Sequence, residues 1–429
     1  MAMGFALVLA ALWLVMPSSA AAAQCRFTVS GNVRVTVDDR LAVLKGRNTD
    51  FALSGAMVKV SGRRNGPFVE WGTVAAGPAG SFSVEQWRNC GSKHRYRVEI
   101  KFQDKDVMIA NNGISPSFKI HQDGSDRSGT SVPLGTLSFG AGAANDLGDG
   151  IARAHAQLWV IAKLTRQTLD GLGQGFGARR LKIHYPTVLP THADVVTNDV
   201  YLQRRPQANP PKDDLFGGGG ESIVVHESMH IWAFEHTKPL SGGEFSLIWN
   251  LPGGTHEQRE LVGTAFNEGF AEYAKDKLFE TMFPAVPRRL PFNRRFLSCS
   301  KNLVTLDDVQ HNDDGWTSIL HTLTTPELHN FDFGVATPCS GPPDVIGQIA
   351  GAPLSGCTSP DVTFRQILAL FDRHSPEFPD KLSLSDMNIN GFLDRAIKVI
   401  GGTLTGKAPM YRAVASPGGT QQPRDFLCQ

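Results

Sequence analysis

Hydrophobic and polar positions alternate through the first third of the chain with the period of two that is typical of β-strands. Residues 96–102 alternate apolar with charged side chains, residues 33–37 repeat the alternation, and residues 57–60 follow it more loosely. Clusters of turn-forming residues separate these runs, at 63–67, 77–80 and 111–113. Short strands between turns, with no helical stripe, predict an antiparallel β-sandwich over residues 24–139.

The periodicity changes after residue 150. Residues 140–150 (GAGAANDLGDG) are small, polar and turn-prone, which indicates a linker. An apolar stripe then predicts a helix over 151–170, a strand follows at 181–185, and 200–202 reads as part of another. Helical patterns dominate from 221 onward. The predicted fold class is therefore α+β, with an N-terminal antiparallel β-sandwich followed by a mostly helical domain over 151–429.

The first 23 residues have the pattern of a cleaved export signal. An unbroken apolar run covers residues 5–16, Pro17 ends it, and Ala21 and Ala23 form a small-x-small cleavage site. No Lys or Arg precedes the run, so an uncleaved membrane anchor is the alternative. We expect a secreted, extracellular or periplasmic protein that has no membrane contact once the signal is removed.

Charge and cysteine content indicate which partners and which covalent links to expect. The chain has 42 Lys and Arg against 41 Asp and Glu, which argues against a nucleic-acid partner bound through bulk positive charge. Its six cysteines form no CxxC pair, so three disulfides are expected in an exported chain. Fifteen connectivities are possible. We expect the pairs Cys25–Cys90, Cys339–Cys357 and Cys299–Cys428.

Candidate chemistry lies where the glutamates concentrate, since nine of the 14 fall between 221 and 280. His226, Glu227 and His230 form a His-Glu-x-x-His motif. On a helix the two histidines share one face, so both rings can reach one metal ion. Glu227 lies beside that face, where its carboxylate can accept a proton from water at the metal. Two core histidines with a Glu between them are the plain structural alternative.

A second motif strengthens the metal hypothesis. Glu268 and Glu272 are four residues apart in Asn-Glu-Gly-Phe-Ala-Glu-Tyr, on a stretch predicted to be helical over 257–280. Two carboxylates on the buried side of a helix need a cation or hydrogen-bond partners. A zinc ion held by two histidines and one glutamate would supply the cation, and the other carboxylate would orient a ligand histidine.

These two motifs together resemble the gluzincin metallopeptidases, which include thermolysin and aminopeptidase N. The resemblance implies a zincin-like fold, Zn²⁺ as cofactor, and His226, His230 and Glu268 as its ligands. It also implies Glu227 as general base and Glu272 as the brace of a ligand histidine. Residues 25–139 resemble transthyretin-like or carboxypeptidase-regulatory-like β-sandwich modules, through short runs such as Gly55–Val60, which usually serve as structural or binding accessories.

The chain departs from the gluzincin pattern between the motifs. Glu268 follows His230 by 38 positions, where the family has about 20, and residues 238–255 read as an inserted loop. His236 fits a metzincin spacing, but Ala233 replaces the glycine of that family, and on a continuing helix His236 would lie about 240° around from His230. No Gly-x-Met-Glu-Asn segment for an exopeptidase is present.

The donor that would stabilise the oxyanion is left open by the sequence. His321, on a predicted helix, is the candidate, and His311, His329 and Tyr411 are alternatives. The sequence thus predicts an exported zinc metallopeptidase that hydrolyses peptide bonds of a peptide or protein substrate. The alternative is a catalytically inactive zincin-like protein that binds a surface or ligand through its β-sandwich. The oligomeric state is not predicted.

Overall fold

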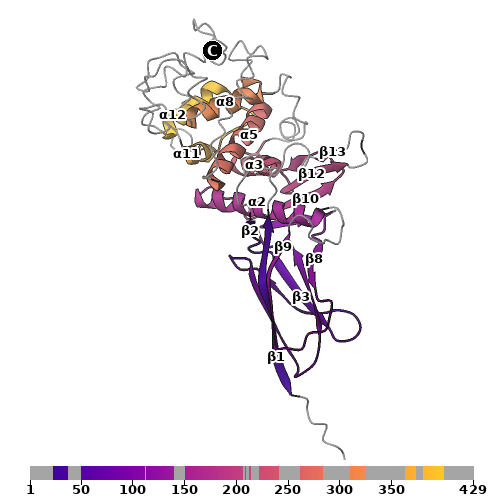
Figure 1. The fold of residues 1–429 in the computed structure, drawn as a ribbon. Coiled ribbons are helices and arrows are strands. Elements are labelled where there is room, and N and C mark those ends of the chain that lie inside the picture. The colour runs from indigo at the N-terminus through magenta and orange to yellow at the C-terminus, as the bar shows by residue number, and fades with distance from the viewer. Residues whose placement is uncertain are drawn as a thin grey trace, which may run out of the picture.

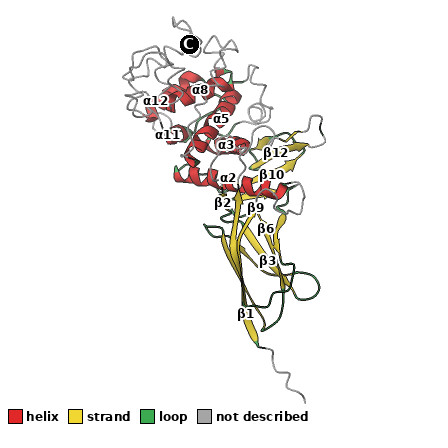
Figure 2. Ribbon diagram, viewed as in Figure 1, coloured by secondary structure: helices red, strands yellow, loops and turns green. Residues whose placement is uncertain are grey.

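The computed structural model shows a protein with strands gathered toward one end and helices toward the other (Figures 1 and 2). The structure describes residues 23–36, 50–111, 113–139, 150–205, 208, 212–213, 222–240, 261–283, 310–324, 363–372 and 380–400. The α+β prediction is confirmed, because β-rich sheets precede a helical region. The predicted export signal lies outside the described residues except for Ala23, and the predicted linker lies outside them except for Gly150.

Two four-stranded sheets build the N-terminal part. The first contains β1 (Gln24–Thr36), β2 (Asp50–Ala52), β5 (Ser81–Asn89) and β9 (Ser131–Phe139). The second contains β3 (Met57–Arg63), β4 (Val69–Ala75), β6 (Arg95–Lys101) and β8 (Ser117–Gln122). Alternate side chains of these strands, such as Val33, Val58 and Val98, are fully buried in one core. The alternation over 96–102 therefore predicted β6 correctly.

One strand pairing departs from the antiparallel prediction. β1 pairs antiparallel with β2 and β5, but β9 runs parallel to β1, with Thr28 opposite Ser131 and Val35 opposite Phe139. β9 starts at the same end of the sheet as β1, because the chain enters it from the turn that follows β8. Periodicity cannot distinguish the two directions, since both present alternate side chains to one face.

A third sheet connects the N-terminal strands with the helical region. It contains β7 (Val107–Ala110), β10 (Leu181–Thr187), β11 (His192–Asp194), β12 (Asp199–Arg205) and β13 (Lys212–Asp213). β10 lies at its centre and pairs in parallel with β7 and β12. β11 is an antiparallel edge strand beside β12. The strands predicted at 181–185 and 200–202 are confirmed, whereas β7 pairs with a strand more than 70 residues further along the chain.

Helix α2 (Ile151–Gly171) matches the helix predicted over 151–170 and packs between the sheets and the remaining helices (Figure 1). Its small residues allow close packing, and the ring of Trp159 is almost fully buried. The Trp159 indole Nε1 donates to the backbone oxygen of Ser54 at 3.0 Å, and the guanidinium of Arg153 donates to Thr36. α2 therefore attaches directly to the N-terminal sheets.

The described part of the region that carries the motifs contains α3 (Ser222–His236), α5 (Val262–Met282), α8 (Asp313–Thr324), α11 (Phe364–Ala369) and α12 (Ile389–Ile400). Aromatic side chains fill the space between them. Phe266 of α5 packs edge-on against Trp316 of α8, and Phe270 packs against Phe371. None of the helices that the structure describes is both long and apolar enough to cross a membrane.

The disulfide Cys25–Cys90 is confirmed. It joins the start of β1 to the turn after β5, at the end of the sheets farthest from the helices (Figure 1). The other four cysteines lie outside the described residues.

Candidate metal centre

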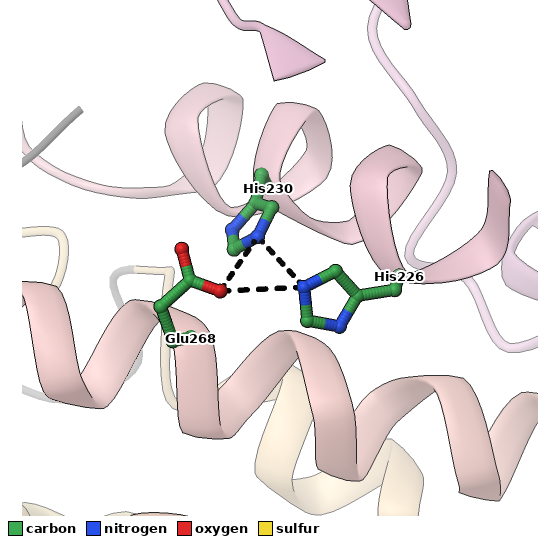
Figure 3. Close-up of side chains that lie close together, drawn as sticks. All are labelled: His226, His230 and Glu268. Atoms are coloured by element: carbon green, nitrogen blue, oxygen red, sulfur yellow. Dashed lines mark hydrogen bonds and ion pairs between the residues drawn. The ribbon is translucent and has the colours of Figure 1, made fainter. Parts of the chain in front are cut away.

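The first two donors of the candidate centre lie on α3. Its apolar residues Val224, Val225, Met229 and Trp232 are buried, which fixes the helix against its neighbours. The Trp232 indole donates to the backbone oxygen of Gln174 at 2.8 Å. With that face buried, His226 and His230 project together from the side that faces α5 (Figure 3).

The third donor, Glu268, lies on α5, and the next residue allows the neighbouring helix to approach closely. A Cβ atom on Gly269 would lie 2.5 Å from the backbone oxygen of Asp313 and 2.7 Å from the Cβ of Trp316. The hydroxyl of Thr317 also donates to the Gly269 oxygen at 3.0 Å. The glycine of the Asn-Glu-Gly segment thus allows α8 to pack closely against α5 next to Glu268.

Three donor atoms converge between the two helices (Figure 3). His226 Nε2 lies 3.1 Å from His230 Nε2, and Glu268 Oε2 lies 3.3 Å from each of these nitrogens. These atoms form a group that could hold a metal ion. The structure brings Glu268, and not His236, to the two histidines.

The spacing fits zinc. In a tetrahedral site with bonds of about 2.0–2.1 Å, neighbouring ligand atoms lie about 3.3–3.4 Å apart. The observed separations of 3.1, 3.3 and 3.3 Å match one face of such a tetrahedron, and no His, Cys, Asp or Glu among the described residues adds a fourth donor. Two imidazole nitrogens that face each other at 3.1 Å also need a proton or a cation between them, because their lone pairs would otherwise repel.

Charge interactions hold this group together. Burial by itself would raise the pKa of Glu268, but the charge of His230 and hydrogen bonds from both histidines outweigh it and lower the pKa well below its usual value. Burial would lower the pKa of His230, yet Glu268 raises it. The group therefore contains a carboxylate that stays ionised at neutral pH, as a cation site requires.

Glu272 lies one turn beyond Glu268 and contacts the other side of His226. Its Oε2 is 3.2 Å from His226 Nδ1. The contact lacks hydrogen-bond geometry, but a carboxylate on this side of the ring favours a hydrogen on Nδ1, which leaves the lone pair of Nε2 free to point at a metal. The Lys275 ammonium donates to the other Glu272 oxygen at 2.5 Å. The sequence reasoning overlooked Lys275, although its i,i+3 spacing from Glu272 was a readable signal.

Glu227 is enclosed next to the three donors, with 8% of its surface exposed. Burial raises the pKa of Glu227, the charges of His226 and His230 oppose the rise, and that of Glu268 adds to it. A carboxyl group with a raised pKa is better matched to proton transfer near neutral pH than an exposed one.

Two other histidines considered in the sequence analysis have partners of their own in the helical region. His236 stacks on Trp232 at 4.2 Å, and its ring nitrogens contact Asp372 at 3.2 Å and the Gly175 oxygen at 3.1 Å. His321 is 2% exposed, and its Nε2 lies 3.3 Å from Asp276. Of the other oxyanion candidates, His311 is among the described residues, whereas His329 and Tyr411 are outside them.

Comparison with known proteins adds little to this picture. No protein-family model matches the chain, and no curated protein matches it. Among solved structures, a 9R-lipoxygenase from Cyanothece PCC8801 aligns with 33% of this chain and 23% of its own, at 13% identity and a TM-score of 0.18. The chain therefore spans less than a quarter of that lipoxygenase, and a TM-score of 0.18 does not indicate a shared fold. The site itself is more informative, since a His-His-Glu group on two packed helices fits the geometry of HExxH…E zincins.

Proposed function

We propose that this protein is an exported zinc metallopeptidase that hydrolyses peptide bonds. The observation that carries the proposal is the triangle of His226, His230 and Glu268 donor atoms, 3.1–3.3 Å apart, to which the described residues add no fourth donor. Two histidines and one carboxylate with an open position are the donor set of a hydrolytic zinc site. When bound there, zinc supplies Lewis-acid polarisation of a carbonyl and lowers the pKa of water.

The protein's own residues then supply proton transfer and positioning. Glu227 accepts the proton of the attacking water and passes it to the leaving amine. Its burial excludes bulk water from this transfer. Glu272 holds His226 through the 3.2 Å contact to Nδ1, so that Nε2 faces the metal position. His321 as the oxyanion donor stays a prediction, which a His321→Gln variant with reduced kcat and unchanged zinc content would support.

The neighbouring sheet edge favours an extended peptide as the substrate. α3 packs against β11, which is an edge strand among the described residues and pairs there with β12 alone. The open side of an edge strand presents backbone N–H and C=O groups that can pair with an added peptide strand. Val188 and Val196, which flank β11 in the chain, are 69% and 52% exposed. They offer apolar contacts for the side chains of a bound peptide.

The decisive experiment measures zinc content and casein hydrolysis together. We expect about one zinc per chain in the wild type. Glu227→Gln should retain the metal and lose roughly 10²–10⁴-fold in kcat, because only the proton acceptor is removed. Glu268→Gln should lose both metal and activity. Glu280→Gln, on the same helix but paired with Lys277, is the matched control and should change neither.

Two results would overturn the proposal. One is a wild-type protein that binds no zinc under metal-replete conditions. The other is a Glu227→Gln variant that hydrolyses casein at the wild-type rate.

A further inference from the structure

The end of the N-terminal sheets farthest from the helices carries an excess of positive charge. The strand pairings bring the start of β1, the end of β3 and the turns at 64–68, 90–94 and 123–130 to this end, which we call the basic end (Figure 1). Three of its cations have acidic partners, since Arg26 pairs with Glu85, Arg95 with Asp126 and Arg127 with Asp123.

Five further cations at the basic end have no acidic partner among the residues that the structure describes: Arg63, Arg64, Arg88, Lys93 and Arg97. Two of them, Arg63 and Arg97, are brought close to one another. The guanidinium groups of Arg63 and Arg97 both lie over the ring of Phe68, at 4.7 and 4.3 Å from its centroid. Arg63 also stands directly opposite Arg95 across the β3–β6 ladder.

Arg63 and Arg97 hold two like charges over one ring, and like charges on neighbouring strands destabilise a sheet, whereas the charge of Arg95 is already paired with Asp126. The arrangement therefore costs free energy in the isolated protein, and an anion bound across these groups would remove that cost. Guanidinium groups bind carboxylate and sulfate through two parallel hydrogen bonds, which makes arginine the suited residue for such a contact.

Packed side chains and a disulfide connect the segments of the basic end. Arg88 points inward over Trp71 at 4.8 Å, and its buried Nε has no hydrogen-bond partner in the described part of the chain. The ring of Trp71 packs edge-on against His94 and Tyr96. The disulfide Cys25–Cys90 ties the start of β1 to the adjacent turn. A preorganised cationic surface loses less conformational entropy when it binds.

The same end of the sheets carries an exposed aromatic ring. Trp87 of β5 stands opposite Arg26 on the outer side of its sheet and is 63% exposed. A flat indole on a strand can stack against the apolar face of a sugar ring. The turns themselves expose polar side chains such as Asn65 and Ser125, and Val69, beside the 64–68 turn, is 59% exposed.

We infer that the basic end is a docking surface for an acidic polysaccharide, with carboxylate or sulfate groups held by Arg63, Arg64, Lys93 and Arg97 and a sugar ring stacked on Trp87. This surface is separate from the candidate metal centre, so the inference does not depend on the proposed peptidase activity. Its effect would be to hold the exported protein on an anionic matrix.

The test measures binding of the full-length protein to sulfated dextran and to uncharged dextran of equal length. We expect binding to the sulfated polymer alone, weakening as salt rises. Replacing Arg63, Arg64 and Lys93 together by Gln should reduce the affinity roughly tenfold, because each exposed ion pair contributes modestly. Trp87→Ala should weaken binding without changing its salt dependence.

A matched variant tests whether the position of the replaced cations matters for binding, and not only the net charge of the protein. Lys105, Arg365 and Lys398 lie outside the basic end, and replacing all three by Gln removes the same charge. This variant should bind as the wild type does, and thermal unfolding would establish that both triple variants are folded. Equal loss in the two triple variants would overturn the inference, as would no binding to sulfated dextran. Binding to vesicles of phosphatidylserine and phosphatidylcholine, but not to the dextran, would also overturn it in favour of a membrane.

Discussion

The burial of His155 makes a specific prediction about how stability depends on pH. His155 lies on α2 where that helix meets the N-terminal sheets, and its side chain is fully buried. Its Nε2 donates to the backbone oxygen of Tyr185 at 2.6 Å, and its ring packs edge-on against Phe118. Nδ1 has no hydrogen-bond partner among the described residues. Protonation would therefore place an uncompensated charge in the core.

The size of the effect follows from the shifted pKa. Burial lowers the pKa of His155 from 6.5 to about 4, against a smaller opposing effect of the hydrogen bond to Tyr185. Between these values the unfolded chain binds a proton that the folded protein does not, so stability falls as pH falls. The contribution is fully present above pH 6.5. Linkage gives a loss of about 2 kcal/mol at pH 5 and about 3 kcal/mol at pH 4.

The assay compares the wild type with His155→Gln in urea unfolding at pH 7.5, 6 and 5, with chelator present so that metal binding does not contribute. The variant lowers stability at every pH because it disturbs packing, but it removes the titrating ring. The difference between the two free energies of unfolding should therefore shrink by about 2 kcal/mol from pH 7.5 to pH 5. A difference that stays constant with pH would refute the reasoning.

Three further predictions concern the candidate metal centre. Lys275→Met should weaken zinc binding about tenfold, because Glu272 loses its 2.5 Å partner and holds its histidine less firmly, and competition with a chelating dye would measure this. Lys277→Met, which breaks a similar i,i+3 pair on the same helix, should leave zinc affinity unchanged, and an equal loss would contradict the positioning role. Gly269→Ala should destabilise the protein by about 1–3 kcal/mol in urea unfolding, because the added Cβ meets α8 near Trp316, whereas unchanged stability would mean that α8 can move away freely. Zinc added at 1,000 times its dissociation constant should stabilise the metal-free protein by about 4 kcal/mol, seen as a raised thermal midpoint, and no shift would contradict a site formed only in the folded state.

The sequence predicted those features that local pattern determines. The period-two alternation located β6, the apolar stripe located α2, and the i,i+4 spacing placed His226 and His230 on one helical face. The 38-residue separation of Glu268 from His230 did not obscure the site, because the identity of each motif, and not the loop between them, determines which side chains can meet.

The pairing of strands from distant segments could not be predicted from the hydrophobic pattern. β9 presents the same alternation whether it runs parallel or antiparallel to β1, and β7 is only four residues long. The contact of Lys275 with Glu272 depends on a side-chain rotamer, although its spacing allows it. The shifted pKa of His155 depends on which residues cover it, and these come from distant segments of the chain.

The place of β7 in the third sheet constrains how this protein can have evolved. β7 precedes the predicted linker, yet it pairs with β10 on the far side of it. A recombination event at residues 140–150 would separate the two strands and expose the buried edge of β10, including Ile183. The N-terminal sheets and the helical region should therefore be inherited as one unit, and a cut in the linker would leave a nicked protein whose two pieces stay joined through a sheet.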